Sequence, residues 1–437
     1  MTGSASYELL GDGAAALDVD ATALRWPQQP GATATVRSDL GWRLEPWVAV
    51  TPAAVDLIRI AAGAYLADRL TPRGASFSRH LHLTVATTDP APWHGHVGDE
   101  LTGLLHWLTG DLWELNAVDD QTPYEAAPQP TAATVVARRP GTADDKPTTS
   151  LLSGGLDSFL GAIHLLHTHH DVAFVGHRDA ANVVRGAQDR VRQWLSDSYN
   201  PVPSYTRVAV RQATPIREPS SRSRSLLFTA LGSAAAATLD DARVLHIPEN
   251  GYTSINLPLH PNRGGALSTR STHPETFRRI NLILDELGLG VQIDNPFQAL
   301  TKGEAMKLVA ATQPPPGWVE AAAATVSCSK LDGGRITGGN PNYNCGLCVP
   351  CLVRRATFIA ADQPDQTPYL ATSLTGASLD ELVSRRRSDI EAVRYAITVG
   401  VDDDQIDAGT WPPDHDLDAA ADLVRRGLDE LAAVALP

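Results

Sequence analysis

The chain has 437 residues, of which 43% are hydrophobic and 20% are charged, and its formal net charge at pH 7 is −14. This length suffices for two or three domains with sizeable cores, and the acidic balance argues against a large nucleic-acid surface. The first residues have neither the basic region nor the apolar core of a signal peptide, and no apolar run is long enough to span a bilayer, so we expect a cytoplasmic protein that does not enter membranes.

Residues 1–145 show strand and helix patterns but no motif that carries chemistry. The patterns predict strands at 35–37, 42–50, 79–86 and 131–137, and helices at 55–70 and 101–108. We therefore expect a separate α+β domain of unknown role, which a connection rich in proline joins to the next domain.

Four histidines of this region are candidate metal ligands. His80 and His82 share one face of a predicted strand, and His94 and His96 follow them. No carboxylate or cysteine stands at ligand spacing in the sequence, which favours ordinary surface or core histidines.

The most informative stretch runs from Thr148 to Ser158 and has the sequence Thr-Thr-Ser-Leu-Leu-Ser-Gly-Gly-Leu-Asp-Ser. It predicts a short strand, a glycine turn and a helix start, where backbone N–H groups and the helix dipole favour an anion. It is not a Walker loop, because no lysine follows the glycines. The pattern Ser-Gly-Gly-x-Asp-Ser resembles the PP-loop of the ATP pyrophosphatase superfamily, whose members cleave ATP between the α and β phosphates. The alternative is an ordinary glycine-rich turn.

From Thr148 onward, predicted strands alternate with predicted helices, which favours a doubly wound parallel sheet. Further strands are expected at 171–177, 205–210 and 243–247, and helices at 184–195, 226–239 and 275–287. Ligands bind such sheets beyond the carboxyl ends of the strands. The segments expected at that edge are 153–158, 176–177, 216–217 and 248–251.

Polar residues elsewhere in this part are candidates for binding phosphate or substrate. Arg222 and Arg224 stand at a helix entry, where they oppose the dipole and suit phosphate oxygens; the alternative is a solvated basic loop. Arg270 and His273 lie in the long polar loop 252–274 and are candidates for holding a carboxylate or a planar base.

A further helix is predicted to begin at Thr301. Thr301 and Glu304 fit a capping box, so helix capping explains why these two residues stand there. The capping box does not explain Lys302 in the first turn.

All four cysteines of the chain, Cys328, Cys345, Cys348 and Cys351, lie in one short segment. In a cytoplasmic protein this clustering favours a metal over disulfides. Four thiolates suit a tetrahedral structural Zn²⁺, whose closed coordination leaves no position for catalysis. The alternative is a catalytic cysteine, for which the spacing supplies no partner base.

Residues 363–437 predict a C-terminal helical extension without chemistry. Ser378 and Glu381 fit a capping box for a helix at 379–396, and a last helix is expected at 416–434.

Four motifs follow one another in the same order as in the QueC family, which makes 7-cyano-7-deazaguanine. They are the Ser-Gly-Gly-x-Asp-Ser loop, the helix that begins with an arginine, the Thr-Lys-x-Glu helix start and the Ser-Cys…Cys-Gly-x-Cys-x-x-Cys-x-x-Arg segment. The chain resembles this family over about residues 148–362, which implies the PP-loop (HUP-like) fold for that part. Carried over by position, Asp157, Arg224 and Lys302 would be catalytic and the cysteines would bind zinc. The implied ATP contacts are Ser153, Gly154, Gly155, Leu156, Asp157, Ser158, Gly176, His177, Arg222 and Arg224. The implied substrate contacts are Glu249, Asn250, Arg270 and His273.

The sequence also departs from QueC, whose members are much shorter. The Tyr-Gly-Gln of QueC is Val175-Gly176-His177 here, and its Asp-x-Ser-Gly-Tyr-Pro-Asp-Cys loop is replaced by Glu249–Tyr252 and the long polar loop. The architecture is closer to the QueC-like proteins of bacterial anti-phage systems. Among them the QatC group of the Qat system matches best, and a CBASS-associated group is the alternative.

The resemblance implies an enzyme that uses ATP and Mg²⁺ to adenylate 7-carboxy-7-deazaguanine and then joins it to an amine, with AMP and pyrophosphate released. For this group the resemblance implies a partner protein of the same operon as a candidate amine donor. Two alternatives remain: a tRNA-modifying PP-loop enzyme, which the acidic charge disfavours, and a non-catalytic nucleotide-binding subunit of a defence complex.

Overall fold

A computed structural model describes residues 4–11, 13–26, 35–38, 50–74, 78–120, 147–169, 171–178, 181–212, 215–239, 243–263, 267 and 269–437. The strand predicted at 131–137, and all of the strand predicted at 42–50 except Val50, lie outside these residues.

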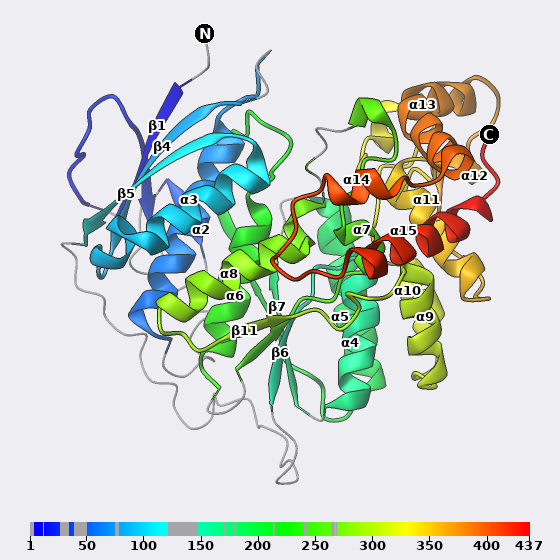
Figure 1. The fold of residues 1–437 in the computed structure, drawn as a ribbon, viewed down its shortest axis with the longest axis horizontal. Coiled ribbons are helices and arrows are strands. Elements are labelled where there is room, and N and C mark those ends of the chain that lie inside the picture. The colour runs from blue at the N-terminus through cyan, green and yellow to red at the C-terminus, as the bar shows by residue number, and fades with distance from the viewer. Residues whose placement is uncertain are drawn as a thin grey trace.

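The N-terminal region is built on a four-stranded sheet in the order β2-β1-β4-β5 (Figure 1). Its strands are β1 (Ser4–Gly11), β2 (Thr22–Trp26), β4 (His80–Thr87) and β5 (Leu112–Asp119). Its helices are α2 (Pro52–Leu70) and α3 (His96–Thr109), preceded by the short η1 (Ala91–His94).

The α+β class expected for this region is wrong, because all pairings in this sheet are parallel. Between β4 and β5 the helix α3 carries the chain back, which is how parallel neighbours must be joined. The described part of the region is therefore α/β.

The central sheet has five strands in the order β11-β10-β6-β7-β8, and all of its pairings are also parallel. The strands are β6 (Thr148–Leu151), β7 (Val172–His177), β8 (Tyr205–Val208), β10 (Val244–His246) and β11 (Gln292–Asp294). The predicted parallel sheet is thus confirmed. The three-residue β11 was too short to be predicted.

Helices cover both faces of the central sheet (Figure 1). One face carries Leu152 and Phe174, which pack with α4 (Leu156–Thr168) and α5 (Asn182–Ser198). The other face carries Leu151 and Val175, which pack with α6 (Arg224–Ala236) and α8 (Pro274–Glu286). Because adjacent residues of a strand point to opposite faces of the sheet, these short apolar strands contribute side chains to two hydrophobic cores.

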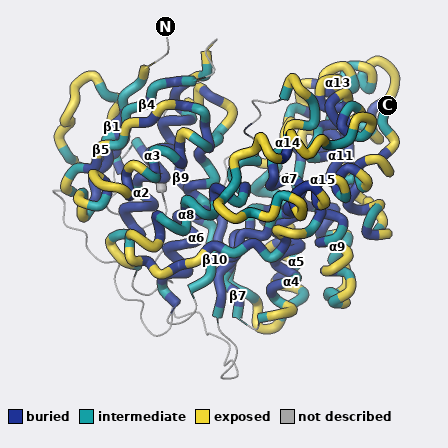
Figure 2. Tube along the Cα trace, in the orientation of Figure 1, coloured by how far each residue is buried: buried dark blue, intermediate teal, exposed yellow. Residues whose placement is uncertain are grey.

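The N-terminal region shares its core with the central sheet. Helix α2 packs against α6, and the buried positions run continuously from one sheet into the other (Figure 2). The short β3 (Val36–Ser38) also pairs antiparallel with β9 (Val210–Gln212). The division of the chain near residues 145 and 362 stays a prediction.

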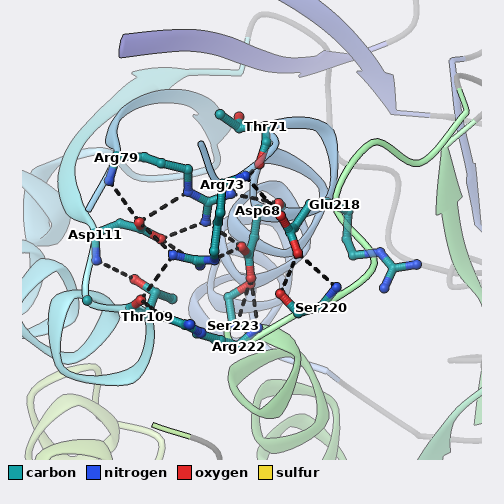
Figure 3. A network of polar contacts seen from close by, with 12 residues as sticks. Asp68, Thr71, Arg73, Arg79, Thr109, Asp111, Glu218, Ser220, Arg222 and Ser223 are labelled. Atoms are coloured by element: carbon teal, nitrogen blue, oxygen red, sulfur yellow. Dashed lines mark hydrogen bonds and ion pairs between the residues drawn. The ribbon is translucent and has the colours of Figure 1, made fainter. Parts of the chain in front are cut away.

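A buried ionic network crosses this junction (Figure 3). The guanidinium of Arg79, only 2% exposed, lies 2.5 Å from Asp68 and 2.6 Å from Asp111, both fully buried. Arg73 pairs with the same two carboxylates at 3.1 and 2.9 Å. Asp68 also accepts hydrogen bonds from Ser223 at the start of α6. The network therefore holds α2 against α6, a helix that covers the central sheet.

Helices dominate the rest of the chain: α7 (Gly251–Ser254), α9 (Lys302–Ala311), α10 (Trp318–Ala323), α11 (Val349–Ala360), α12 (Leu370–Ser373), α13 (Gly376–Val399), α14 (Asp403–Asp407) and α15 (Leu417–Ala432). The same part of the chain also contains three short 3-10 helices, η2 (Pro261–Arg263), η3 (Arg270–Thr272) and η4 (Gly333–Arg335). The capping box predicted at Ser378 is wrong, because α13 already begins at Gly376. Within the described ranges no helix combines the length and apolarity needed to cross a membrane.

Candidate functional site

The loop between β6 and α4 brings two serine hydroxyls together. Ser158 Oγ accepts from the Ser153 N–H at 3.2 Å, donates to the Gly155 carbonyl at 3.1 Å, and lies 3.1 Å from Ser153 Oγ. The first helical hydrogen bond runs from Phe159 N to Gly155 O, at 3.1 Å. The N–H groups of Leu156 and Asp157 therefore precede the helical ladder, as anion-binding helix starts require.

Gly154 is required by the shape of this turn. Its φ is +87°, in the left-handed region, and a Cβ there would lie 2.9 Å from Gln188 Cγ. Gln188 is itself buried, and its amide donates to the carbonyls of Ser153 at 3.2 Å and His177 at 3.0 Å. It ties the loop to the end of β7, a role that the sequence did not indicate.

Four polar residues meet beside the loop. Lys302 Nζ lies 2.6 Å from Asp157 Oδ2. The other oxygen, Asp157 Oδ1, accepts from the Asn250 side-chain amide at 3.0 Å. The same amide lies 3.4 Å from Glu249 Oε1. The structure thus unites Asp157, Lys302, Glu249 and Asn250, four of the residues singled out from the sequence.

The two carboxyl groups of this cluster are shifted in opposite directions. Burial would raise the pKa of Asp157, but Lys302 and the hydrogen bonds from its neighbours hold it below its usual range. Burial, followed by the nearby Asp157 charge, raises the pKa of Glu249 well above its usual range. Asp157 is therefore held as the charged partner of Lys302, while the charged form of Glu249 is disfavoured.

The sheet order explains why these residues meet. Strand β6 lies between β7 and β10, so the order of strands along the chain reverses between β6 and β10. Ligands of doubly wound sheets bind beyond the carboxyl ends of the strands at such a switch point. Asp157 follows β6, and Glu249 and Asn250 follow β10.

Lys302 is positioned by the start of α9. The predicted capping box is confirmed: Thr301 Oγ1 accepts from Glu304 N at 3.1 Å, and Glu304 Oε2 accepts from Thr301 N at 2.9 Å. Glu430 of α15 binds the same helix start through Thr301 Oγ1 and, at 3.1 Å, the Gly303 N–H. The C-terminal helices thus support the site, although Glu430 could not be found from local sequence.

Arg222 and Arg224 take different positions at the start of α6. The Arg222 guanidinium donates to the Thr109 carbonyl of the N-terminal region at 2.8 Å (Figure 3). Arg224 lies over the Phe228 ring, 5.8 Å from its centre. Phosphate binding by either arginine stays a prediction.

Gly176 and His177 at the end of β7 have packing roles. A Cβ on Gly176 would lie 2.7 Å from the Leu152 carbonyl, so close strand packing excludes a side chain there. The His177 ring is 1% exposed and packs edge-on between Tyr65 and Phe228. Contact of either residue with ATP stays a prediction.

Arg270 and His273 both contact Trp107 of α3. The Arg270 guanidinium lies 4.1 Å from the ring centre and donates to the Trp107 carbonyl at 3.0 Å. His273 is buried and accepts from Glu275 N at the start of α8 at 3.1 Å, and burial lowers the pKa of its ring to about 4. Their predicted contact with substrate stays a prediction.

The four cysteines form a buried cluster whose sulfurs all lie within 4.8 Å of one another. The sulfurs of Cys328 and Cys348, and those of Cys345 and Cys351, are 3.8 Å apart. A tetrahedral Zn²⁺ with Zn–S bonds of about 2.3 Å has sulfurs about 3.8 Å apart, so the cluster fits zinc. Three backbone N–H groups, of Lys330, Cys345 and Cys348, donate to these sulfurs as expected for thiolates.

The cysteine segment also touches the glycine loop, because Val326, two residues before Cys328, donates to the Gly154 carbonyl at 3.1 Å. A closed four-sulfur site at this place holds the chain in position and supplies no catalytic metal.

No protein-family model matches this sequence, and a search of curated proteins finds no match.

Proposed function

We propose that the chain is a QueC-like, ATP-dependent enzyme with a PP-loop fold, which adenylates the carboxylate of 7-carboxy-7-deazaguanine or a similar deazapurine and transfers it to an amine. One observation carries the proposal. The Ser-Gly-Gly-x-Asp-Ser loop and the Asp157–Lys302 pair, which are distant in sequence, meet at the switch point of a parallel sheet. The sequence resemblance to QueC-like defence proteins supports extending the proposal to a role in bacterial anti-phage defence.

In this proposal the substrate carboxylate attacks the α-phosphorus of ATP, and the bond to the bridging oxygen of the β-phosphate breaks. Pyrophosphate leaves into the loop, where the hydroxyls of Ser153 and Ser158 and the first N–H groups of α4 receive its charge. The amine then attacks the acyl carbon, AMP leaves, and the amine loses a proton. No nucleophilic side chain is needed, because positioning and electrostatics supply the rate.

The carboxylates of Asp157 and Glu249 are suitable ligands for Mg²⁺, which prefers oxygen. When bound, Mg²⁺ neutralises the charge of the phosphates. A cation bound by both carboxyls would favour the charged form of Glu249, whose pKa burial and the Asp157 charge raise. With Asp157 holding a cation, the Lys302 ammonium would be available to pair with phosphate oxygens.

The test is to incubate the purified protein with ATP, Mg²⁺ and 7-carboxy-7-deazaguanine, with and without ammonia, and to follow nucleotides and products by mass spectrometry. We expect AMP and pyrophosphate. Asp157→Asn and Lys302→Met should slow their release at least ~100-fold, as loss of one charge-stabilising group does. Lys307→Met, at an exposed position of the same helix α9, is the matched control and should retain the wild-type rate. Release of ADP and phosphate would refute the proposal.

The product identifies the amine. Free amido- or cyano-deazaguanine means that ammonia is the acceptor. AMP without a free product, together with a mass shift on a co-expressed neighbour protein, means that the acceptor is a protein amine.

A further inference from the structure

A second group of metal-binding side chains lies far from the cysteines, on the sheet of the N-terminal region. Along β4, Leu81, Leu83 and Val85 are buried in the core, whereas His80 and His82 alternate with them and point to the other face. Their side chains are 35% and 37% exposed, so this face is open to small ions.

The neighbouring strand supplies the carboxylate that the local sequence lacks. Glu114 of β5 pairs with His82 in the parallel register, and cross-strand partners lie on the same face. Its Oε1 lies 2.7 Å from His80 Nε2, and its Oε2 lies 2.8 Å from His82 Nδ1. One carboxylate therefore lies between two imidazoles, whose ring centres are 4.3 Å apart.

We propose that His80, His82 and Glu114 form a binding site for a divalent transition-metal ion such as Zn²⁺ or Ni²⁺. The three ligand atoms lie within 4.8 Å of one another, and among the described residues they form one of two such groups, the other being the four cysteines. Two imidazoles and a carboxylate suit these metals, whereas Mg²⁺ prefers oxygen alone.

The spacing of the ligands fits a metal after a small adjustment. With metal–ligand bonds of about 2.1 Å, adjacent ligand atoms lie ~3.0 Å apart in octahedral and ~3.4 Å apart in tetrahedral coordination. The two contacts of 2.7 and 2.8 Å must therefore open by about 0.2–0.3 Å for octahedral coordination and by about 0.6–0.7 Å for tetrahedral coordination. The Glu114 side chain is 61% exposed and is free to make this movement.

The site differs in kind from the four-cysteine site. Three protein ligands leave one or more coordination positions open on the solvent side, where a water or a group of another molecule binds. The remaining two histidines of the segment do not join it: His94 Nε2 lies 2.8 Å from the Ala117 carbonyl oxygen, and His96 pairs with Glu286.

The experiment titrates the full-length protein, already loaded with one zinc, with Zn²⁺ in the presence of a competing chromophoric chelator. We expect a second equivalent to bind. In His82→Gln and Glu114→Gln its affinity should fall at least ~10- to 100-fold, the loss that even an outer partner of a metal ligand causes. The matched controls are His106→Gln in α3 and Glu391→Gln in α13, both exposed residues outside the cluster, and they should bind the second equivalent as the wild type does.

The proposal would be overturned if no second equivalent of Zn²⁺ binds, or if it binds equally well to Glu114→Gln. The cluster would then be only two histidines hydrogen-bonded to one carboxylate. Glu114→Gln keeps a carbonyl oxygen between the two rings, so its unfolding in the absence of the second metal should equal that of the wild type. Co²⁺ provides an independent readout: bound at this site it lacks the intense thiolate absorption of cobalt at four cysteines.

Discussion

The buried ion pair of Lys302 and Asp157 gives the sharpest test of the site. The two charges are 2.6 Å apart, and their side chains are 6% and 11% exposed, so solvent screens them little. At an effective dielectric constant near 20 the attraction amounts to ~6 kcal/mol before the cost of desolvation. Replacing Lys302 by Met keeps most of the volume but leaves Asp157 buried beside Glu249 without a cation.

We expect Lys302→Met to lower the free energy of unfolding by about 3–5 kcal/mol at pH 7, the usual result of leaving one buried charge unpaired. The pKa of Asp157 in the folded wild type lies below its ordinary value of 3.8, so its contribution is present above that value and is lost as the pH falls. In the variant the folded pKa of Asp157 is higher, because Lys302 no longer stabilises its charge. The cost of burying this unpaired charge disappears once the Asp157 carboxyl is protonated. The difference between the two proteins should therefore be largest near neutral pH and should shrink toward pH 4.

The assay is urea unfolding followed by tryptophan fluorescence and circular dichroism between pH 4 and 8. Lys302→Met/Asp157→Asn removes both charges and should recover most of the lost stability without recovering ATP turnover. The control Lys307→Met should stay within ~0.5 kcal/mol of the wild type. A loss below ~1 kcal/mol at pH 7, a loss independent of pH, or no recovery in the double variant would refute the reasoning.

Three further predictions concern zinc, Glu249 and the junction with the N-terminal region. Cys348→Ser should reduce bound zinc below one per chain, and removal of the metal should cost folding free energy on the order of 10 kcal/mol; elemental analysis that still finds one tightly held zinc would contradict the four-sulfur site. Burial and the Asp157 charge raise the folded pKa of Glu249, so its carboxyl destabilises the fold as the pH rises above its ordinary value of 4.5, and Glu249→Gln should flatten the decline of stability above that pH; an unchanged slope in urea unfolding would count against the raised pKa. Arg79→Met leaves the buried carboxylates of Asp68 and Asp111 with less positive charge beside them and should lower the free energy of unfolding by about 3–5 kcal/mol in the same assay. A loss below ~1 kcal/mol would show that Arg73 alone compensates the two negative charges.

The parts of the site that depend on local sequence were predictable. The glycine turn before α4, the capping box of Thr301 and Glu304, and the cysteine cluster each occupy a short segment whose residues act on their neighbours. The approach of Asp157 to Asn250 followed from the alternation of strands and helices, since that pattern brings the ends of parallel strands to one edge.

Contacts between distant segments that do not lie at the ends of neighbouring strands were not predictable. Gln188, Glu430 and Glu114 act on partners that the fold brings to them, and no local pattern marks them. Arg222 and Arg270 have the chemistry of ligand-binding residues, yet their described contacts are with the N-terminal region. A guanidinium bonds a protein carbonyl as readily as a phosphate, so residue type alone does not separate the two.

The class of the N-terminal sheet was mispredicted for a related reason. Strands β1 and β2 are parallel neighbours although no helix joins them in the described chain. By contrast, β4 and β5 are parallel neighbours joined by α3, the strand–helix–strand unit that a sequence pattern predicts.

The contact of Glu430 with the start of α9 has a consequence for how the protein is made. Glu430 is synthesised 127 residues after Gly303, whose N–H it binds. At the usual speed of translation, that interval is roughly 6 to 25 s. A nascent chain can therefore form the central sheet, the glycine loop and the capping box of α9 while the helix start that carries Lys302 still lacks its contact with Glu430. The helix start that carries Lys302 gains this contact only when α15 has left the ribosome, so the surroundings of Lys302 reach their final arrangement late in synthesis.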